Sequence, residues 1–286
     1  MVAILGGLGA AMSWAIATLA SSRSSRMIGP MSVLGWVMAV GLVAAIGPAM
    51  LATPVALDSS KLIELVALGL SHNIGLLLAY RALTIGQVSI VAPITATEGA
   101  AAALLSVILG EALGLETAVI LAVIAVGVVL AAAERAADRP ASEVSGDQNR
   151  KAALYALAAA FTFSIGLVLG GRLGAAGVPP SWVIVASRLV GVTVIVLPLV
   201  LTRRFRITRA ALPLVILSGV LEAFGGAVYV IAASNGVAVA AVLSSQFAAF
   251  AAVGAFLLFG ERLQRLQLVG VVVIAIGITV LAAVQA

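Results

Sequence analysis

The stretch Gly110-Glu111-Ala112-Leu113 recurs 150 positions later as Gly260-Glu261-Arg262-Leu263, and this recurrence decides the fold. The same offset, without a gap, matches Val123-Ile124-Ala125 and Gly127 to Val273-Ile274-Ala275 and Gly277. It also pairs Pro30 with Pro180, Gly41 with Gly191, Pro48 with Pro198, Gly69 with Gly219, Gly75 with Gly225, and Gly86 with Gly236. Alanine matches are common by chance in this composition, but proline and glycine matches are not. The chain therefore contains two copies of one unit.

The composition places both copies in a lipid bilayer. Of the 286 residues, 63% are hydrophobic and 9% are charged, whereas a soluble domain has about 25% charged residues. The mean hydropathy is +1.24. A helix crosses the hydrocarbon core with about 20 apolar residues, and no segment alternates with the period of a barrel strand. The sequence thus predicts an all-α polytopic membrane protein with ten spans, at residues 2–20, 31–51, 62–80, 88–109, 115–133, 152–171, 181–201, 211–233, 237–259 and 266–284.

A polar segment divides the ten spans into two sets of five. Residues 137–150, within the mixed-charge stretch from Glu134 to Lys151, predict a flexible linker between a first unit at 1–136 and a second unit at 151–286. Because five is odd, the second copy enters the membrane from the opposite side, which predicts an inverted-topology repeat. This architecture is typical of secondary transporters, whose substrate site lies near the midplane where the repeats meet. Small residues at a spacing of four predict close helix packing at Gly166, Gly170 and Gly174.

The basic residues indicate membrane orientation rather than a nucleic-acid partner. The formal net charge is +5, and thirteen of the sixteen Lys and Arg residues lie in the loops that follow the odd-numbered spans. The other side carries only Lys61 and Arg172, and Arg188 lies within a span. The positive-inside rule therefore predicts an inner-membrane protein with both termini outside the cytoplasm.

The residue inventory argues against an enzyme. The chain has no cysteine and one histidine, so disulfides, thiolate catalysis and a His or Cys metal cluster are excluded, and no cofactor is expected. No metalloprotease, nucleophile-elbow, Walker or dinucleotide motif occurs. Ser71 and His72 are neighbours about 100° apart on one helix, so an intramembrane protease would need a serine from another helix. Without an ATP-binding motif, transport must use substrate or ion gradients.

Two segments resemble the conserved block of the drug/metabolite transporter superfamily, EamA type. The first half reads Tyr80-Arg-Ala-Leu, Gly86-Gln-Val-Ser-Ile-Val-Ala-Pro93 and Leu109-Gly110-Glu111. The second half reads Tyr229, Asn235-Gly236-Val-Ala-Val and Phe259-Gly260-Glu261-Arg262-Leu263. Within that superfamily the chain is similar to YddG-like exporters of amino acids and related metabolites.

The resemblance implies a central cavity bounded by spans 3, 4, 8 and 9 with parts of 1, 2, 6 and 7, while spans 5 and 10 pack outside. It also implies export of amino acids or related small metabolites by alternating access. A multidrug or nucleoside efflux carrier and a channel-like facilitator are the alternatives. The expected partners are a small-molecule substrate and the bilayer, with no nucleic acid, and the chain is expected to be a monomer or weak homo-oligomer.

Leu243 stands at the position where the repeat with Pro93 predicts a proline, so the two halves are expected to bend unequally. Many relatives place both termini in the cytoplasm, opposite to the charge count.

Ionisable residues in the spans are the first site candidates, because a charge at mid-membrane depth costs several kcal/mol unless it is paired or lines a cavity. Glu64 lies near a helix start, where an interfacial role is expected. His72, Glu98 and Glu222 lie near span centres and are candidates for substrate contact and proton coupling. The offset of 150 makes His72 and Glu222 equivalent, either as a structural pair or as cavity lining. Glu98 has the further option of neutralising Arg188.

Uncharged residues at similar depth complete the candidate cavity. A lone Ser or Thr in a helix more often bonds its own backbone than a ligand, but Ser244, Ser245 and Gln246 are consecutive and cover a wide arc. Aromatic walls are predicted from Trp14, Tyr80, Phe163 and Tyr229, although packing explains each one alone. The two Gly-Glu pairs predict structural corners, with each Glu at the start of the following helix. The other polar residues at this depth are Ser13, Asn73, Thr95, Thr97 and Ser164.

Overall fold

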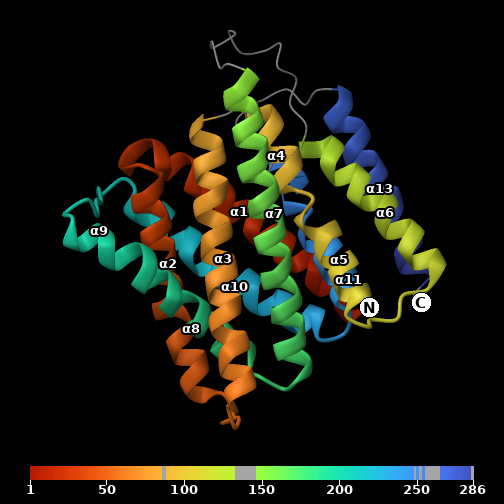
Figure 1. The fold of residues 1–286 in the computed structure, drawn as a ribbon, viewed down its shortest axis with the longest axis horizontal. Coiled ribbons are helices and arrows are strands. Elements are labelled where there is room, and N and C mark those ends of the chain that lie inside the picture. The colour runs from red at the N-terminus through yellow and green to blue at the C-terminus, as the bar shows by residue number, and fades with distance from the viewer. Residues whose placement is uncertain (86–87, 133–145, 248, 251–252, 255–264, 285–286) are drawn as a thin grey trace.

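The computed structural model describes residues 1–85, 88–132, 146–247, 249–250, 253–254 and 265–284, and regular structure within these ranges is helical (Figure 1). The elements, in chain order, are α1 (Val2–Ile28), α2 (Pro30–Leu51), α3 (Ser59–Ile85), α4 (Val88–Thr95), α5 (Glu98–Ile108), α6 (Leu115–Ala132), α7 (Gly146–Ala175), α8 (Pro180–Gly191), the π-helix η2 (Val192–Val196), α9 (Leu197–Leu201), α10 (Leu212–Ala233), α11 (Val237–Ser244) and α13 (Arg265–Val284).

Seven helical segments of the described chain are long and apolar enough to cross a membrane. The protein is therefore a multi-pass membrane protein, as predicted. The segments Pro93–Ile108 and Leu115–Ala131 are apolar but shorter, and the predicted ninth span is described only at residues 237–247, 249–250 and 253–254. The seven long segments are α1, α2, Ser59–Ala82 of α3, Arg150–Ala175 of α7, Pro180–Leu201, α10 and α13.

One expectation about the chain path needs correction. The predicted linker at 137–150 extends too far, because α7 begins at Gly146; residues 137–145 lie outside the described ranges. The helix path is interrupted at positions that match to within one residue in the two halves, and the expected unequal bending stays a prediction. α4 ends at Thr95, and α11 ends at Ser244 even though Leu243 stands in place of Pro93.

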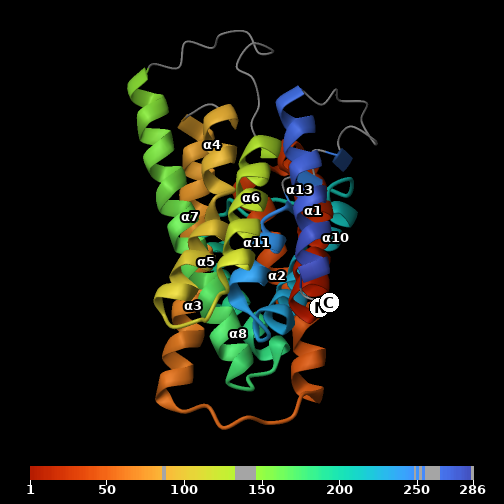
Figure 2. The ribbon, with the colours of Figure 1, turned by 90° about the vertical axis from the view of Figure 1, so that its right-hand side faces the viewer.

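The offset of 150 residues recurs in the packing of the helices. α1 packs against α10, and α3 packs against α7. The offset makes α1 equivalent to α7 and α3 equivalent to α10, so these two helix contacts are equivalent. A Cβ on Gly69 would lie 2.8 Å from a Val190 methyl, and a Cβ on Gly219 would lie 2.7 Å from Val40 Cβ. Because each contact joins one half to the other, the halves interlock. Figure 2 shows the loop between α2 and α3 at the opposite end of the molecule from the start of α7 and α13.

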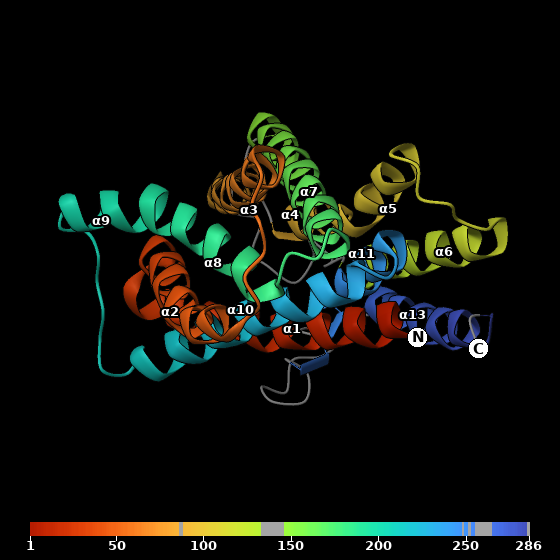
Figure 3. The ribbon, with the colours of Figure 1, turned by 90° about the horizontal axis from the view of Figure 1, so that it is seen from below.

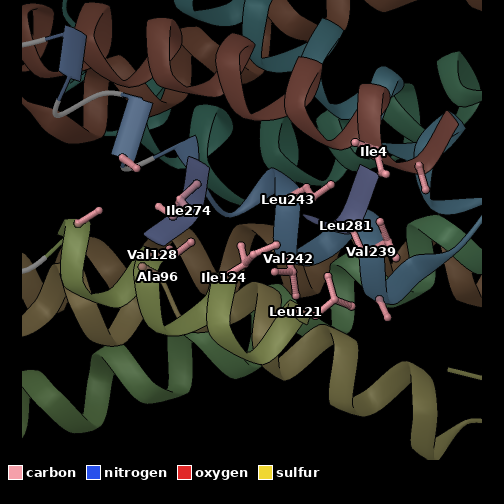
Figure 4. Close-up of a cluster of buried hydrophobic side chains, with 14 residues drawn as sticks. Ile4, Ala96, Leu121, Ile124, Val128, Val239, Val242, Leu243, Ile274 and Leu281 are labelled. Atoms are coloured by element: carbon pink, nitrogen blue, oxygen red, sulfur yellow. The ribbon is translucent and has the colours of Figure 1, made fainter. Parts of the chain in front are cut away.

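Spans 5 and 10 form an edge of the molecule, as the resemblance implied. They correspond to α6 and α13, which pack on each other and lie beside α11 (Figures 1 and 3). The apolar cluster between them includes Ile124 and Val128 of α6, Ile274 of α13 and Val242 of α11 (Figure 4). Gly277 lets α13 approach Ile124 closely, since a Cβ there would lie 2.5 Å from Ile124 Cγ1.

The predicted glycine stripe on α7 is a packing surface. A Cβ on Gly174 would lie 2.9 Å from the Val230 carbonyl oxygen, and one on Gly170 would lie 3.5 Å from the Tyr229 ring. α7 therefore approaches α10 through these small residues, as expected for helices that pack within a membrane.

Polar groups at the start of α3 stabilise the loop end of the molecule. The Lys61 amide donates to Asp58 Oδ1 at 2.8 Å, and this hydrogen bond lowers the pKa of Asp58 below its usual value. Glu64 accepts from Arg172 of α7 at 3.2 Å. Glu64 thus links α3 to α7, outside the group of deep ionisable residues described next.

Candidate functional site

A charged cluster lies where α2, α3, α8 and α10 meet. Arg188 of α8 is 2% exposed, and its Nη2 lies 2.8 Å from Glu222 Oε2 on α10. His72 of α3 faces the other carboxylate oxygen, with Nε2 3.7 Å from Glu222 Oε1. Buried charges persist when they are paired and hydrogen-bonded, so Glu222 is the centre of this cluster.

The cluster consists of two pairs of residues, and the two members of each pair lie 150 positions apart in the chain. Met38 is equivalent to Arg188, and its Sδ accepts from Arg188 Nη1 at 3.2 Å; His72 is equivalent to Glu222. A Cβ on Gly41 would lie 3.1 Å from Arg188 Nε, so this glycine makes room for the guanidinium group. Neither Arg188 nor Met38 was among the predicted site residues. The position of Arg188 within a span was the signal that could have found it, and the repeat offset from Arg188 could have found Met38.

The alternative in which Glu98 neutralises Arg188 is wrong, because Arg188 pairs with Glu222. Glu98 is buried at the first turn of α5, where the helix dipole favours a carboxylate. Within the described ranges, Glu98 has no ion-pair partner. The two deep carboxylates therefore have different surroundings.

Aromatic residues surround the cluster on the sides of α1 and α7. Trp14 Nε1 donates to the backbone oxygen of Glu222 at 3.3 Å, and its ring centroid lies 6.0 Å from that of Tyr229. Phe163 of α7 lies 5.9 Å from the His72 ring. Tyr229 donates to the Leu167 carbonyl at 2.9 Å, so its hydroxyl joins α10 to α7. Tyr80 instead packs against the apolar cluster that contains Met38.

Both interrupted helices bring polar residues to the interior. Ala96 and Thr97 separate α4 from α5, while Ser245 and Gln246 follow α11. The two interruptions adjoin, because a Cβ on Gly99 would lie 2.5 Å from Ser245 Oγ. Discontinuous helices at mid-membrane depth form the ligand sites of many secondary transporters.

Most hydroxyl groups among the predicted residues are bonded within their own helix. Ser13 and Thr95 donate to the carbonyl four residues earlier, at 2.9 Å each. The hydroxyl groups of Thr97, Ser164, Ser244 and Ser245 donate to the carbonyl three residues earlier. The contacts of Ser13, Thr95, Thr97 and Ser164 agree with the expectation for an isolated hydroxyl. Ser244 and Ser245, which were set apart as consecutive cavity candidates, bond the backbone in the same way.

Four side chains have buried polar atoms without a hydrogen-bond partner within the described part of the chain. Neither amide atom of the fully buried Gln246 has a partner, and Asn73 bonds Gly69 and Ser187 through Nδ2 but leaves Oδ1 free. His72 Nε2 and Arg188 Nε are also without a hydrogen bond. Buried polar atoms without partners are rare and call for an explanation, and a bound polar ligand provides one. The described residues contain no group of three potential metal-ligating side chains.

The first Gly-Glu pair lies at the turn after α5, and its glutamate contacts the second half of the chain. Ala238 N, at the start of α11, lies 3.1 Å from Glu111 Oε2 and donates to this carboxylate. Glu111 was expected at the start of the next helix, α6; it stabilises the N-terminal end of α11 instead. The corner role predicted for Glu111 stands, while Gly260 and Glu261 lie outside the described residues.

Comparison with known proteins places these features in a family. No curated protein matches the chain. One solved structure, described as "Crystal structure of protein", matches 99% of this chain and 97% of its own chain, with 18% sequence identity and a TM-score of 0.79, which shows a shared fold. The model of the EamA-like transporter family matches residues 1–133 and 150–283. Because the two matches cover nearly all of both halves, the chain belongs to the EamA-like transporter family.

Proposed function

We propose that this protein is a secondary transporter that exports an amino acid or a related small metabolite across the inner membrane. The central observation is the ion pair between the buried Arg188 and the partly buried Glu222, with Nη2 and Oε2 2.8 Å apart. An α-amino acid carries the same two charges. Its carboxylate can bind the Arg188 guanidinium, and its ammonium group can bind the Glu222 carboxylate, so substrate binding exchanges one set of charge contacts for another.

The repeat supports an alternating-access mechanism. We propose that the units 1–136 and 151–286 are inverted five-span repeats that rock about the site where Met38, Arg188, His72 and Glu222 meet. Pseudo-equivalent residues touch each other there, as they do at a two-fold axis. The adjoining interruptions at Thr97 and Ser245 support the same location for the substrate.

A transport assay with a substrate panel tests this function. Purified protein in proteoliposomes is expected to accelerate uptake of a labelled amino acid when the same unlabelled amino acid fills the lumen. Nucleosides and cationic drugs should compete weakly. Preference for a nucleoside or drug would support efflux of those compounds, and flux that is linear in concentration with no counterflow would support a channel-like facilitator.

Replacing Gln246 with Leu should separate transport from stability. The amide is fully buried without a partner, so Gln246→Leu should raise the free energy of unfolding by about 1–2 kcal/mol. If the amide contacts substrate, exchange should fall about tenfold. Ser244→Ala is the matched control, because Ser244 bonds the Ala241 carbonyl. Normal exchange by Gln246→Leu would assign the amide to packing alone.

The distribution of basic residues predicts the orientation. Thirteen Lys and Arg residues lie on one side of the predicted topology and two on the other, so we propose that both termini face the periplasm. Alkaline phosphatase fused after Ala286 should be active in a bacterial host, whereas a fluorescent protein that matures only in the cytoplasm should stay dark there. The opposite pair of signals would reverse the orientation.

A further inference from the structure

An apolar groove of about 420 Å³ opens between α2 and α10, a volume within the range of small-ligand sites. The side chains of α2 that line it extend from Trp36 to Ala44, a rise of about 12 Å along the helix. One leaflet of hydrocarbon is about 15 Å deep, so the groove matches the depth of a single leaflet. The lining residues are all apolar: Trp36, Ala39, Val40, Val43, Ala44, Ile216 and Val220.

Four arginines lie in the loop that leads into α10. Residues 202–211 contain Arg203, Arg204, Arg206 and Arg209 and no acidic residue. All four arginines are exposed. Across the described ranges none of them has an ion-pair partner. The loop therefore presents uncompensated positive charge at the end of α10 that borders the groove.

Trp36, which also lines the groove, joins the same loop to the N-terminal part of α2. The Trp36 indole donates to the Arg206 carbonyl at 2.9 Å, and the ring stacks on Phe205 with centroids 4.6 Å apart. Ser32 donates to the Arg204 carbonyl at 3.2 Å and accepts from the Arg206 amide at 3.3 Å. These contacts fix the arginine backbone at the mouth of the groove.

Arg203 occupies a backbone conformation that favours glycine. Its φ is 54°, and the Arg204 amide donates to the Leu199 carbonyl at 2.8 Å while the Arg203 amide donates to that of Val200 at 3.0 Å. This is the hydrogen-bond pattern that ends many helices with a glycine. An arginine at this position adds a fourth charge to the loop at the expense of backbone strain.

We propose that the groove and this loop bind one anionic phospholipid, with an acyl chain along α2 and α10 and the headgroup phosphate on the arginines. Basic segments next to a membrane attract anionic lipids, and a tryptophan is suited to the interface between headgroups and hydrocarbon. A second copy of this chain is a poorer occupant, because a two-fold contact through this face would bring two arginine loops together. The proposal is independent of the transported substrate.

Lipid competition tests the site. The full-length protein, purified in detergent and supplied with equal amounts of phosphatidylglycerol and phosphatidylcholine, is examined by native mass spectrometry. We expect phosphatidylglycerol to be retained preferentially, and Arg204→Gln/Arg206→Gln to reduce this preference about tenfold. Arg150→Gln/Arg265→Gln is the matched control, because these exposed arginines lie near the starts of α7 and α13, which do not line the groove. The control should keep the wild-type preference.

Two further variants distinguish lipid binding from folding. Ala39→Leu fills the groove and should reduce retention of both lipids. Arg203→Gly removes a charge and the backbone strain, so it should raise the thermal midpoint in lipid-free detergent while weakening phosphatidylglycerol retention. Equal retention of the two lipids by the wild type, or an unchanged preference in Arg204→Gln/Arg206→Gln, would overturn the proposal. A lipid-free dimer that Ala39→Leu dissociates would also overturn it and assign the groove to a second copy of the chain.

Discussion

Arg188→Met should reduce amino-acid exchange by roughly 100-fold or more, since it removes the cation proposed to bind the substrate carboxylate. The same change leaves Glu222, whose side chain is 20% exposed, without its partner, and breaking a fully buried pair costs about 3–5 kcal/mol of stability, which sets the upper limit here. Initial rates of counterflow in proteoliposomes and the thermal midpoint in detergent measure the two effects. A stable, active Arg188→Met protein would remove the pair from the substrate site.

The repeat provides a variant that separates these two effects. Arg188→Met/Glu222→His places in the second half the residues that the first half already has, Met38 and His72. With no unpaired charge left, the double variant should recover most of the lost stability but none of the exchange. Recovery of both would identify the ion pair as a structural link.

A pair whose arginine is exposed provides the control for charge removal. Glu64 and Arg172 also join two helices, and their side chains are 22% and 52% exposed. Ion pairs of this kind contribute about 0–1 kcal/mol. Arg172→Met should therefore change the thermal midpoint little and leave exchange at the wild-type rate.

The helix content of the fold was largely predictable, because length and apolar composition determine where a helix can cross a bilayer. The positions at which a helix is interrupted within a span were not predictable. Gly99 and Ser245 gave no local signal that the half-helices meet, since that contact depends on residues far apart in the chain. Leu243 gave no such signal either, because α11 ends at Ser244 without a proline.

The site was predictable in membership but not in pairing. A charged residue in a span must find a partner, and residue type and depth made His72, Glu98 and Glu222 the candidates, while Arg188 was placed within a span without being made a site residue. Two carboxylates were available to Arg188, and choosing between Glu98 and Glu222 required the geometry of α8 against α10. Met38 was overlooked because methionine is ordinary in a membrane helix. The offset of 150 would have paired it with Arg188.

Glu98→Gln is expected to abolish transport driven by a pH gradient while preserving exchange of internal for external substrate. Glu222 is held by Arg188, whereas Glu98 has no ion-pair partner in the described chain. A carboxylate without a fixed countercharge can bind and release a proton without breaking an ion pair, so we propose Glu98 as the proton-coupling residue. Glutamine keeps the shape and polarity of the side chain but cannot carry the proton.

The pattern across three variants decides among the ionisable candidates. Exchange needs no net proton movement, so its survival in Glu98→Gln would show that the substrate site is intact and that only coupling is lost. His72→Asn keeps a polar side chain and removes the remaining titratable ring beside Glu222; it should keep its response to the gradient if Glu98 alone carries the proton. Loss of the response in His72→Asn or Glu222→Gln, but not in Glu98→Gln, would move coupling to the charged cluster. A wild-type flux that ignores an imposed pH gradient would make the protein a uniporter, in which Glu98 serves only to stabilise the first turn of α5.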